Sequence, residues 1–233
     1  MGIKPLYLVM AAAAAAVVAP MLGMPPASAG DLNKEIPAAA TDPANPADRE
    51  VAVLAGGCFW GQQGLFEHVK GVTKVVAGYA GGAKATADYD KVSSGTTGHA
   101  ESVQITFNPK EVSFGTLLRI YFSVAHDPTE VNRQGPDTGT QYRTEIFASS
   151  PEQEAAAKAY IAQLEAAKIF AKPIATKVEP LKAFYAAEDY HQDYLVHNPD
   201  SAYIRVNDLP KIAALERVWP QYFRSRPVLL AER

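Results

Sequence analysis

The most informative segment of this sequence is Gly56-Gly57-Cys58-Phe59-Trp60-Gly61, which holds the single cysteine of the 233-residue chain. The apolar run 51–55 before it is typical of a buried strand, and apolar residues recur at helical spacing over 65–69. The pattern places Cys58 between a strand and a helix, where free backbone N–H groups and the helix dipole favour a thiolate. A small, buried, unreactive side chain is the alternative, and the local sequence leaves both open.

The composition is that of an ordinary globular protein, with 48% hydrophobic and 20% charged residues. The 22 Lys and Arg residues against 25 Asp and Glu residues give a formal net charge of −3. No basic cluster stands out, so we expect no nucleic-acid partner. One cysteine excludes an internal disulfide and a zinc site of several thiolates. We also expect the chain to act as a monomer.

The first 29 residues have the pattern of a secretory signal peptide. Lys4 precedes an alanine-rich apolar run over 6–22, and an Ala-x-Ala pattern ends at Ala29. We expect cleavage there and export to the periplasm or the extracellular space. A membrane-spanning helix is the alternative, against which the prolines in this stretch argue. Residues 30–48 contain three prolines and no periodic pattern, which predicts a flexible linker.

The remaining chain mixes predicted strands and helices without strict alternation. This order favours an α+β two-layer sandwich over a doubly wound sheet. We expect it to form a catalytic domain over 49–225, followed by a C-terminal tail over 226–233. The expected strands cover 48–55, 72–79, 99–107, 144–148 and 175–179. The expected helices cover 59–70, 113–126, 150–169 and 209–222, with a partly helical segment over 186–198.

An acidic residue lies on the apolar face of the strand expected over 99–107. Alternation puts Glu101 on the same face as Val103, Ile105 and Phe107. An acid on a core-facing row is unusual, and burial would raise its pKa and keep it protonated near neutral pH. The alternative is a strand-end glutamate that bends out to water. The pattern leaves both open.

Four blocks stand in order along the chain, at 57–61, 95–101, 126–143 and 188–199. Gly57-Cys58-Phe59-Trp60-Gly61 opens the series, and Glu101 closes the second block. Together, over residues 50–222, they resemble the peptide methionine sulfoxide reductases of the A type. The resemblance implies a ferredoxin-like core wrapped by long coil segments. It also implies thiol-dependent reduction of the S-epimer of methionine sulfoxide, free or in proteins, to methionine.

The same resemblance assigns the site residues. Cys58 would attack the sulfoxide sulfur as nucleophile, and Glu101 would protonate the sulfoxide oxygen as general acid. The other matching positions would hold the substrate. They are the hydrogen-bond donors Tyr89 and Tyr142, the positioning group Asp137, and an apolar wall for the S-methyl group made of Phe59 and Trp60.

The implied product on the enzyme is a sulfenic acid at Cys58, which must be reduced again. The chain has no second cysteine, and Ile204 stands where some relatives carry a resolving one. Residues 205–210 and the following helix resemble the single-cysteine branch of the family. We therefore expect no bound cofactor and an external thiol reductant, either a thioredoxin-like protein or a small thiol.

Three other interpretations compete with this one. A metal site would use His99, His126 and His191, but these lack close ligand spacing. A Cys/His hydrolase or acyltransferase would need a histidine within reach of the Cys58 sulfur. A non-catalytic exported binding module would leave Cys58 buried and inert. Alkylation and substitution of Cys58 separate these possibilities.

Overall fold

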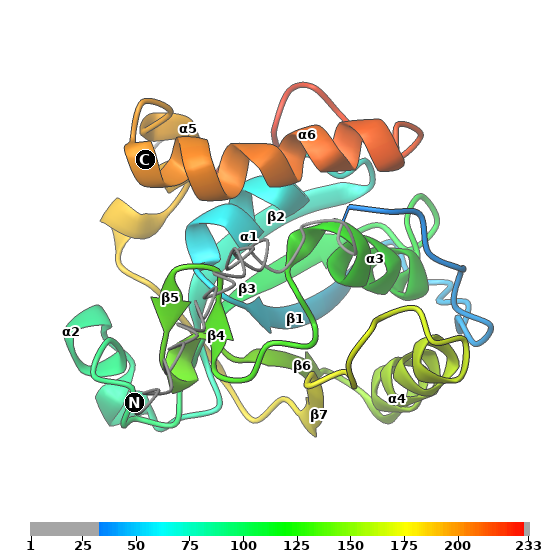
Figure 1. Ribbon diagram of the computed structural model, residues 1–233, viewed down its shortest axis with the longest axis horizontal. Helices are drawn as coiled ribbons and strands as arrows, with labels where there is room; N and C mark the ends of the chain where they lie inside the picture. Colours follow the sequence, from blue (N-terminus) through cyan, green and yellow to red (C-terminus); the bar gives the residue numbers. More distant parts are fainter. Residues whose placement is uncertain (1–32, 231–233) are drawn as a thin grey trace, which may run out of the picture.

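The computed structural model describes residues 33–230, which form a mixed α/β fold (Figure 1). Six strands make a sheet in the order β7-β6-β1-β3-β2-β8. Neighbouring strands are antiparallel except β6 and β7, which are parallel. The strands are β1 (Glu50–Gly56), β2 (Val72–Ala80), β3 (Ala100–Phe107), β6 (Thr144–Ala148), β7 (Lys177–Pro180) and β8 (Phe184–Ala186). Two further short strands, β4 (Arg133–Gln134) and β5 (Asp137–Thr138), pair with each other.

The helices gather mainly on one face of the sheet. They are α1 (Phe59–Glu67), α2 (Tyr89–Val92), α3 (Phe114–Ile120), α4 (Pro151–Ala166), α5 (Tyr194–His197) and α6 (Leu209–Val218). Residues of α1, α3 and α4 share the main core with Ala52 and Leu54 of β1. The opposite face of the sheet carries a smaller apolar cluster that includes Val53 and Phe147. α6 packs against α1 and lies across the top of the view in Figure 1.

Side-chain caps fix where two of these helices begin. The Ser113 hydroxyl accepts a hydrogen bond from Thr116 N–H at 3.1 Å, at the start of α3. The Ser150 hydroxyl accepts one from Gln153 N–H at 3.2 Å, and Pro151 occupies the first turn of α4. Both caps satisfy backbone donors that a helix start leaves free. The predicted starts of these two helices are confirmed.

The mixed α/β character predicted from the sequence is confirmed, and the five expected strands are present. The additional strands β4, β5 and β8 have two or three residues each. Such strands are too short for alternation to appear in the sequence. α1 ends at Glu67 rather than Lys70, and Gly71 (φ 85°) reverses the chain into β2.

Residues 33–42 lie against α3 and α4, which corrects the expectation of a flexible linker for this segment. Ile36 is 2% exposed. Its carbonyl accepts from Arg119 Nε at 2.6 Å, and the Pro37 carbonyl accepts from the Tyr160 hydroxyl at 2.6 Å. The Asp42 carboxylate accepts from Gly115 N–H at 2.9 Å. A buried apolar side chain and paired carbonyls explain why this proline-containing stretch is ordered.

The attachment of this segment predicts a stability effect. We expect Ile36→Ala to lower the free energy of unfolding by about 2–4 kcal/mol, because it leaves a cavity in the main core. Denaturant unfolding of the purified chain measures this. Val131→Ala is the matched control, since Val131 is 72% exposed. Equal stability of the Ile36→Ala variant and the wild type would mean that the segment is not docked.

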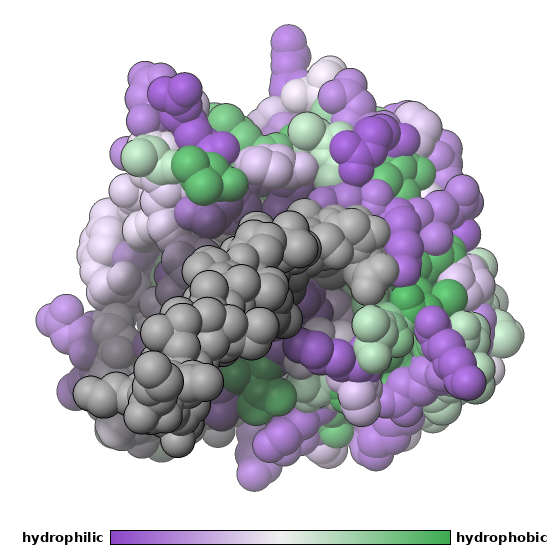
Figure 2. Space-filling view, in the orientation of Figure 1, coloured by the Kyte–Doolittle hydropathy of each residue, from purple (hydrophilic) through white to green (hydrophobic). Residues whose placement is uncertain are grey.

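The predicted signal peptide lies outside the described residues. None of the helices within 33–230 is long and apolar enough to cross a membrane. On the face seen in Figure 2, outside the grey atoms, hydrophilic residues predominate and hydrophobic ones form small separate groups.

Candidate active site

Cys58 is the residue directly before α1, as the sequence predicts. Gly57 turns the chain out of β1 with φ 89°, and a Cβ at Gly57 would lie 2.6 Å from Gln134 Cβ. Only glycine meets both demands. The Cys58 side chain is half-buried and borders a cavity of about 330 Å³, whose other lining residues include His126, Asp137, Tyr203 and Lys211. The thiol is therefore accessible from this cavity.

Glu101 on β3 is buried beside the start of α1. It is 2% exposed, and its Oε2 accepts a hydrogen bond from Phe59 N–H at 3.0 Å. Of the two orientations that the alternation of β3 leaves open, the structure shows the core-facing one. Burial raises the pKa of this carboxyl group from 4.5 to about 8, the Phe59 N–H opposes the rise, and the charge of Asp137 adds to it. Glu101 is thus mostly protonated at neutral pH.

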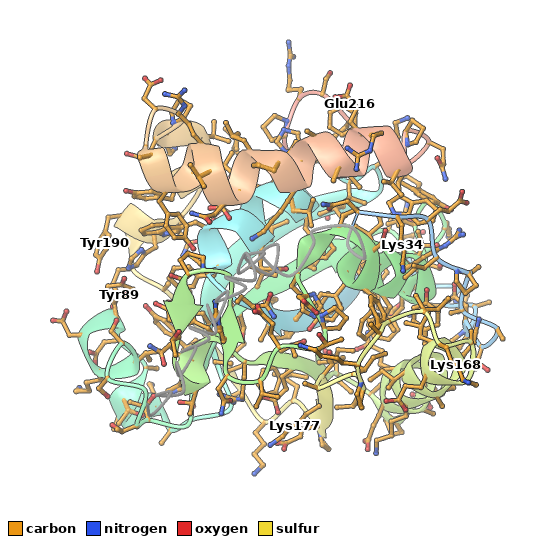
Figure 3. The ribbon with its side chains drawn as sticks, viewed as in Figure 1. Lys34, Tyr89, Lys168, Lys177, Tyr190 and Glu216 are labelled. Atoms are coloured by element: carbon orange, nitrogen blue, oxygen red, sulfur yellow. The ribbon has the colours of Figure 1, made fainter. Side chains whose placement is uncertain are left out.

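Two predicted tyrosines, on different elements, lie near enough to Glu101 and Cys58 to feel their charges. Tyr89 begins α2, and Tyr142 ends the short turn Thr140–Tyr142. Burial and then the charge of Glu101 raise the pKa of both hydroxyls, and the charge of Cys58 adds to each. Both hydroxyls therefore stay protonated and are available as hydrogen-bond donors. Figure 3 shows Tyr89 and Tyr190 at the same edge of the molecule.

The two aromatics that follow Cys58 differ in exposure. Phe59 is 1% exposed, and its ring centroid lies 5.0 Å from that of His191. Trp60 is half-buried, stacks on Tyr194 with centroids 3.8 Å apart, and donates its indole N–H to His191 Nδ1 at 3.0 Å. His191 thus orients Trp60. Phe59 is mainly a core residue, and Trp60 offers a partly exposed ring next to the thiol.

Asp137 on β5 accepts a hydrogen bond from the Tyr203 hydroxyl. Tyr203 also lies edge-on to Trp60, with centroids 5.9 Å apart, and lines the cavity together with Cys58. Sequence reasoning missed Tyr203. Its place directly before Ile204, the position where some relatives carry a resolving cysteine, is the signal that would have found it. Asp208 and Lys211 near the start of α6 were missed as well.

The structure corrects one expectation about Cys58. Its pKa is raised well above the usual thiol value rather than lowered. Burial is the main cause, and the charges of Glu101 and Asp208 add to it. The Trp60 backbone N–H and Lys211 act in the opposite direction. The helix start does stabilise a thiolate, but loss of solvent and two nearby carboxyl groups outweigh it.

A Cys/His hydrolase needs a histidine base near the thiol. His126 is the candidate, because it borders the same cavity as Cys58. Its Nδ1 lies 3.1 Å from the Tyr121 carbonyl and its Nε2 lies 2.7 Å from Thr144 Oγ1, so both ring nitrogens are engaged elsewhere. Burial lowers the pKa of His126 to about 3. It is poorly suited as a base for the Cys58 thiol. Within the described residues, no group of three His, Cys, Asp or Glu side chains is arranged to hold a metal ion.

A carboxyl group that holds its proton at neutral pH beside an accessible thiol is suited to attack coupled to proton delivery. Fold and site thus define a cysteine-dependent enzyme. Residues 50–222 match the family model described as peptide methionine sulfoxide reductase. The chain belongs to this family, as the sequence resemblance predicts.

Individual relatives agree with the family match. The chain is 56% identical over 181 residues to peptide methionine sulfoxide reductase MsrA 2 of Mesorhizobium japonicum, covering 78% of this chain and 93% of that protein. The structure is similar to that of Mxr1 from Saccharomyces cerevisiae in reduced form, with TM-score 0.60, 36% identity, and coverage of 70% and 92%. Methionine sulfoxide reductase A of Corynebacterium diphtheriae follows, with TM-score 0.56, 34% identity, and coverage of 72% and 84%.

Proposed function

We propose that this chain reduces the S-epimer of methionine sulfoxide, free or in peptides and proteins, to methionine, with Cys58 as the source of electrons. The position of Glu101 is the main support for this proposal. Its buried carboxyl group accepts from the N–H of Phe59, the residue after Cys58, and its pKa of about 8 keeps it protonated where a sulfoxide oxygen would lie. A sulfoxide oxygen leaves only after protonation, so a neutral acid beside the nucleophile meets the main chemical demand.

The first half-reaction transfers two electrons. The Cys58 sulfur attacks the sulfoxide sulfur while Glu101 protonates the oxygen. The sulfoxide is reduced to methionine, and Cys58 is oxidised to a sulfenic acid that keeps the oxygen. Tyr89 and Tyr142 donate hydrogen bonds to that oxygen. Asp137 orients Tyr203, and the partly exposed Trp60 ring forms the wall for the S-methyl group, with Phe59 packed behind it in the core.

The second half-reaction needs a reductant from outside the chain, since no other cysteine exists in it. One external thiol attacks the Cys58 sulfenic acid and forms a mixed disulfide with release of water. A second thiol then releases the Cys58 thiol and leaves the reductant as a disulfide. A thioredoxin-like protein or a small thiol fills this role. The cavity bordered by Cys58 supports direct access of such a thiol.

The tyrosines give a test of oxygen binding. We expect Tyr142→Phe and Tyr89→Phe each to lower the rate of the reductase step about tenfold, the effect of one lost hydrogen bond to a charge-bearing oxygen. Stopped-flow single turnover with a sulfoxide peptide measures this rate. Tyr190→Phe is the control, because Tyr190 is 62% exposed. Unchanged rates in both site variants would remove the tyrosines from the mechanism.

We include the type of fold, the bounds of the catalytic domain and export in the same proposal. The order β1-α1-β2-β3-α3-β6, with strand order β6-β1-β3-β2, supports a ferredoxin-like core. The domain over 49–225 is supported by the family match to 50–222. The alanine-rich leader over 1–29 supports export to the periplasm or beyond.

A comparison of the two sulfoxide epimers tests the proposed function. Methionine formation is followed with the S-sulfoxide and the R-sulfoxide of a methionine peptide, each with dithiothreitol as reductant. We expect methionine from the S-epimer alone. Equal rates with both epimers would contradict the stereochemical assignment, and no product from either would contradict the proposed function.

A further inference from the structure

A buried ion pair lies at the first turn of α1, outside the residues assigned to the reaction. Asp208 is fully buried at the end of the turn Ile204–Asp208, and its Oδ1 lies 3.1 Å from Lys211 Nζ on α6. Lys211 is partly exposed and borders the cavity that Cys58 also borders. The pair is thus placed between the surface of α6 and the nucleophile.

Gly61, three residues after Cys58, lets the pair approach this closely. A Cβ at Gly61 would lie 2.0 Å from Asp208 Oδ1 and 3.0 Å from Lys211 Nζ. The Asp208 carboxylate therefore sits against the N-terminal turn of α1, where the helix dipole attracts negative charge. It occupies the same positive end of the helix that would otherwise stabilise a Cys58 thiolate.

Stability alone does not account for this arrangement. The second Asp208 oxygen is buried without a hydrogen-bond partner among the described residues. A buried ion pair with an unpaired oxygen is often no better than packed apolar side chains. Burial raises the pKa of the Asp208 carboxyl, and Lys211 opposes that rise. An arrangement of this kind points to a role in the chemistry of its neighbour.

The charges around Cys58 come from several elements. Asp208 and Glu101 disfavour a Cys58 thiolate, whereas Lys211 and the Trp60 N–H favour it. Asp137 on β5 adds to the raised pKa of both Glu101 and Asp208. The other titratable groups that lie near the thiol or line the same cavity are Tyr89, Tyr142, Tyr203, His126, Asp127 and Glu130. Among these groups, Asp208 is the carboxylate placed at the helix start with a cation of its own.

We propose that Asp208 and Lys211 are positioning residues that set the protonation of the Cys58 thiol. Asp208 keeps the resting thiol protonated, and Lys211 opposes this effect. A protonated thiol is a weak nucleophile and a poor target for oxidants. Low reactivity of the resting thiol protects Cys58 from oxidation, which matters because the chain has no second cysteine to reduce it again. The inference rests on the proposed function only for its purpose, since the protonation itself is measured without substrate.

The test uses the pH dependence of Cys58 alkylation by iodoacetamide in the full chain, where the single cysteine makes the signal unambiguous. We expect Asp208→Asn to raise the alkylation rate at neutral pH about tenfold, which corresponds to a thiol pKa lower by one unit. We expect Lys211→Gln to lower it about tenfold for the opposite reason. We expect Lys211→Arg to keep the wild-type profile. We expect the double variant Asp208→Asn and Lys211→Gln to have an alkylation rate between those of the two single variants.

Opposite shifts of the alkylation profile in the Asp208 and Lys211 variants would show that charge acts on Cys58, and not damage to the structure. Loss of the pair as a structural element would move both profiles in the same direction. Lys158→Gln is the control, because it breaks the exposed pair of Lys158 and Glu154 on α4 with the same change in charge. If Asp208→Asn does not fold, the alkylation profiles of Lys211→Gln and Lys211→Arg still test the proposal. Shifts of the same sign, or a Lys211→Gln profile equal to that of the control, would overturn the proposal. Loss of reductase activity with opposite shifts intact would count against the proposed function alone.

Discussion

Cys58→Ser is expected to abolish methionine formation, with a rate lower by roughly 10⁴-fold or more. A serine hydroxyl is a much weaker nucleophile than a thiol at neutral pH, and its oxygen has no counterpart of the sulfenic acid that takes up the sulfoxide oxygen. Single-turnover assays with a sulfoxide peptide measure this loss. The variant should fold normally, because Cys58 is half-buried and makes no side-chain cap to α1.

A matched variant separates the position of the thiol from its presence. The double change Cys58→Ser and Ser94→Cys keeps one thiol in the chain but moves it to an exposed loop residue. We expect this variant to be inactive with dithiothreitol. Substantial activity of either variant would mean that Cys58 is not the nucleophile.

Glu101→Gln is expected to lower the reductase step by about 10²–10⁴-fold, the usual contribution of a general acid. An amide oxygen can still accept the hydrogen bond from Phe59 N–H, so the geometry at the start of α1 persists. The amide has no acidic proton to give to the sulfoxide oxygen. Glu67→Gln is the control, since Glu67 is also buried and has a raised pKa of about 9, but it lies at the other end of α1. Equal rates in wild type and Glu101→Gln would exclude Glu101 as the acid.

The raised pKa of Glu101 also predicts a pH dependence. The acid is present below about pH 8 and is lost as the pH rises through that value, so the rate contribution of Glu101 should fall there. Comparison of wild type with Glu101→Gln over this range isolates that contribution. A ratio of the two rates that stays constant from neutral pH to well above 8 would contradict the assignment.

The same pKa has a consequence for stability with a definite sign. Between 4.5 and about 8 the folded chain keeps a proton on Glu101 that the unfolded chain has lost, so this group makes the protein less stable as the pH rises through that window. At neutral pH the cost is about 3 kcal/mol. We expect Glu101→Gln to be at least as stable as wild type there, which denaturant unfolding measures. A marked loss of stability would mean that the activity loss reflects damage to the fold.

Much of the fold follows from local sequence patterns. The apolar run before Cys58 forms β1, and the alternation that ends at Phe107 forms β3 with Glu101 turned inward. Ser113 and Ser150 mark helix starts because their hydroxyls pair with free N–H groups in the first turn. These features depend on neighbours within a few residues, which is why the sequence predicts them.

The features that the sequence did not predict depend on contacts between distant segments. Residues 33–42 have no periodic pattern, and contacts with distant segments, among them Arg119 of α3 and Tyr160 of α4, hold them in place. The raised pKa of Cys58 comes from burial and from carboxyl groups 43 and 150 residues further along the chain, at Glu101 and Asp208. Tyr203 joins the site through Asp137, from a segment 66 residues away. No local sequence pattern shows which distant residues come into contact in the folded chain.

In the proposed mechanism Cys58 alone carries out the reduction of the sulfoxide and needs an outside thiol to repeat it. The most direct test is a single-turnover experiment without any added thiol, in which methionine is quantified and Cys58 is analysed by mass spectrometry after a sulfenic acid trapping reagent. We expect one methionine per chain and the trapped adduct on Cys58. Continued methionine formation beyond one per chain, or methionine without a sulfenic acid at Cys58, would contradict this mechanism.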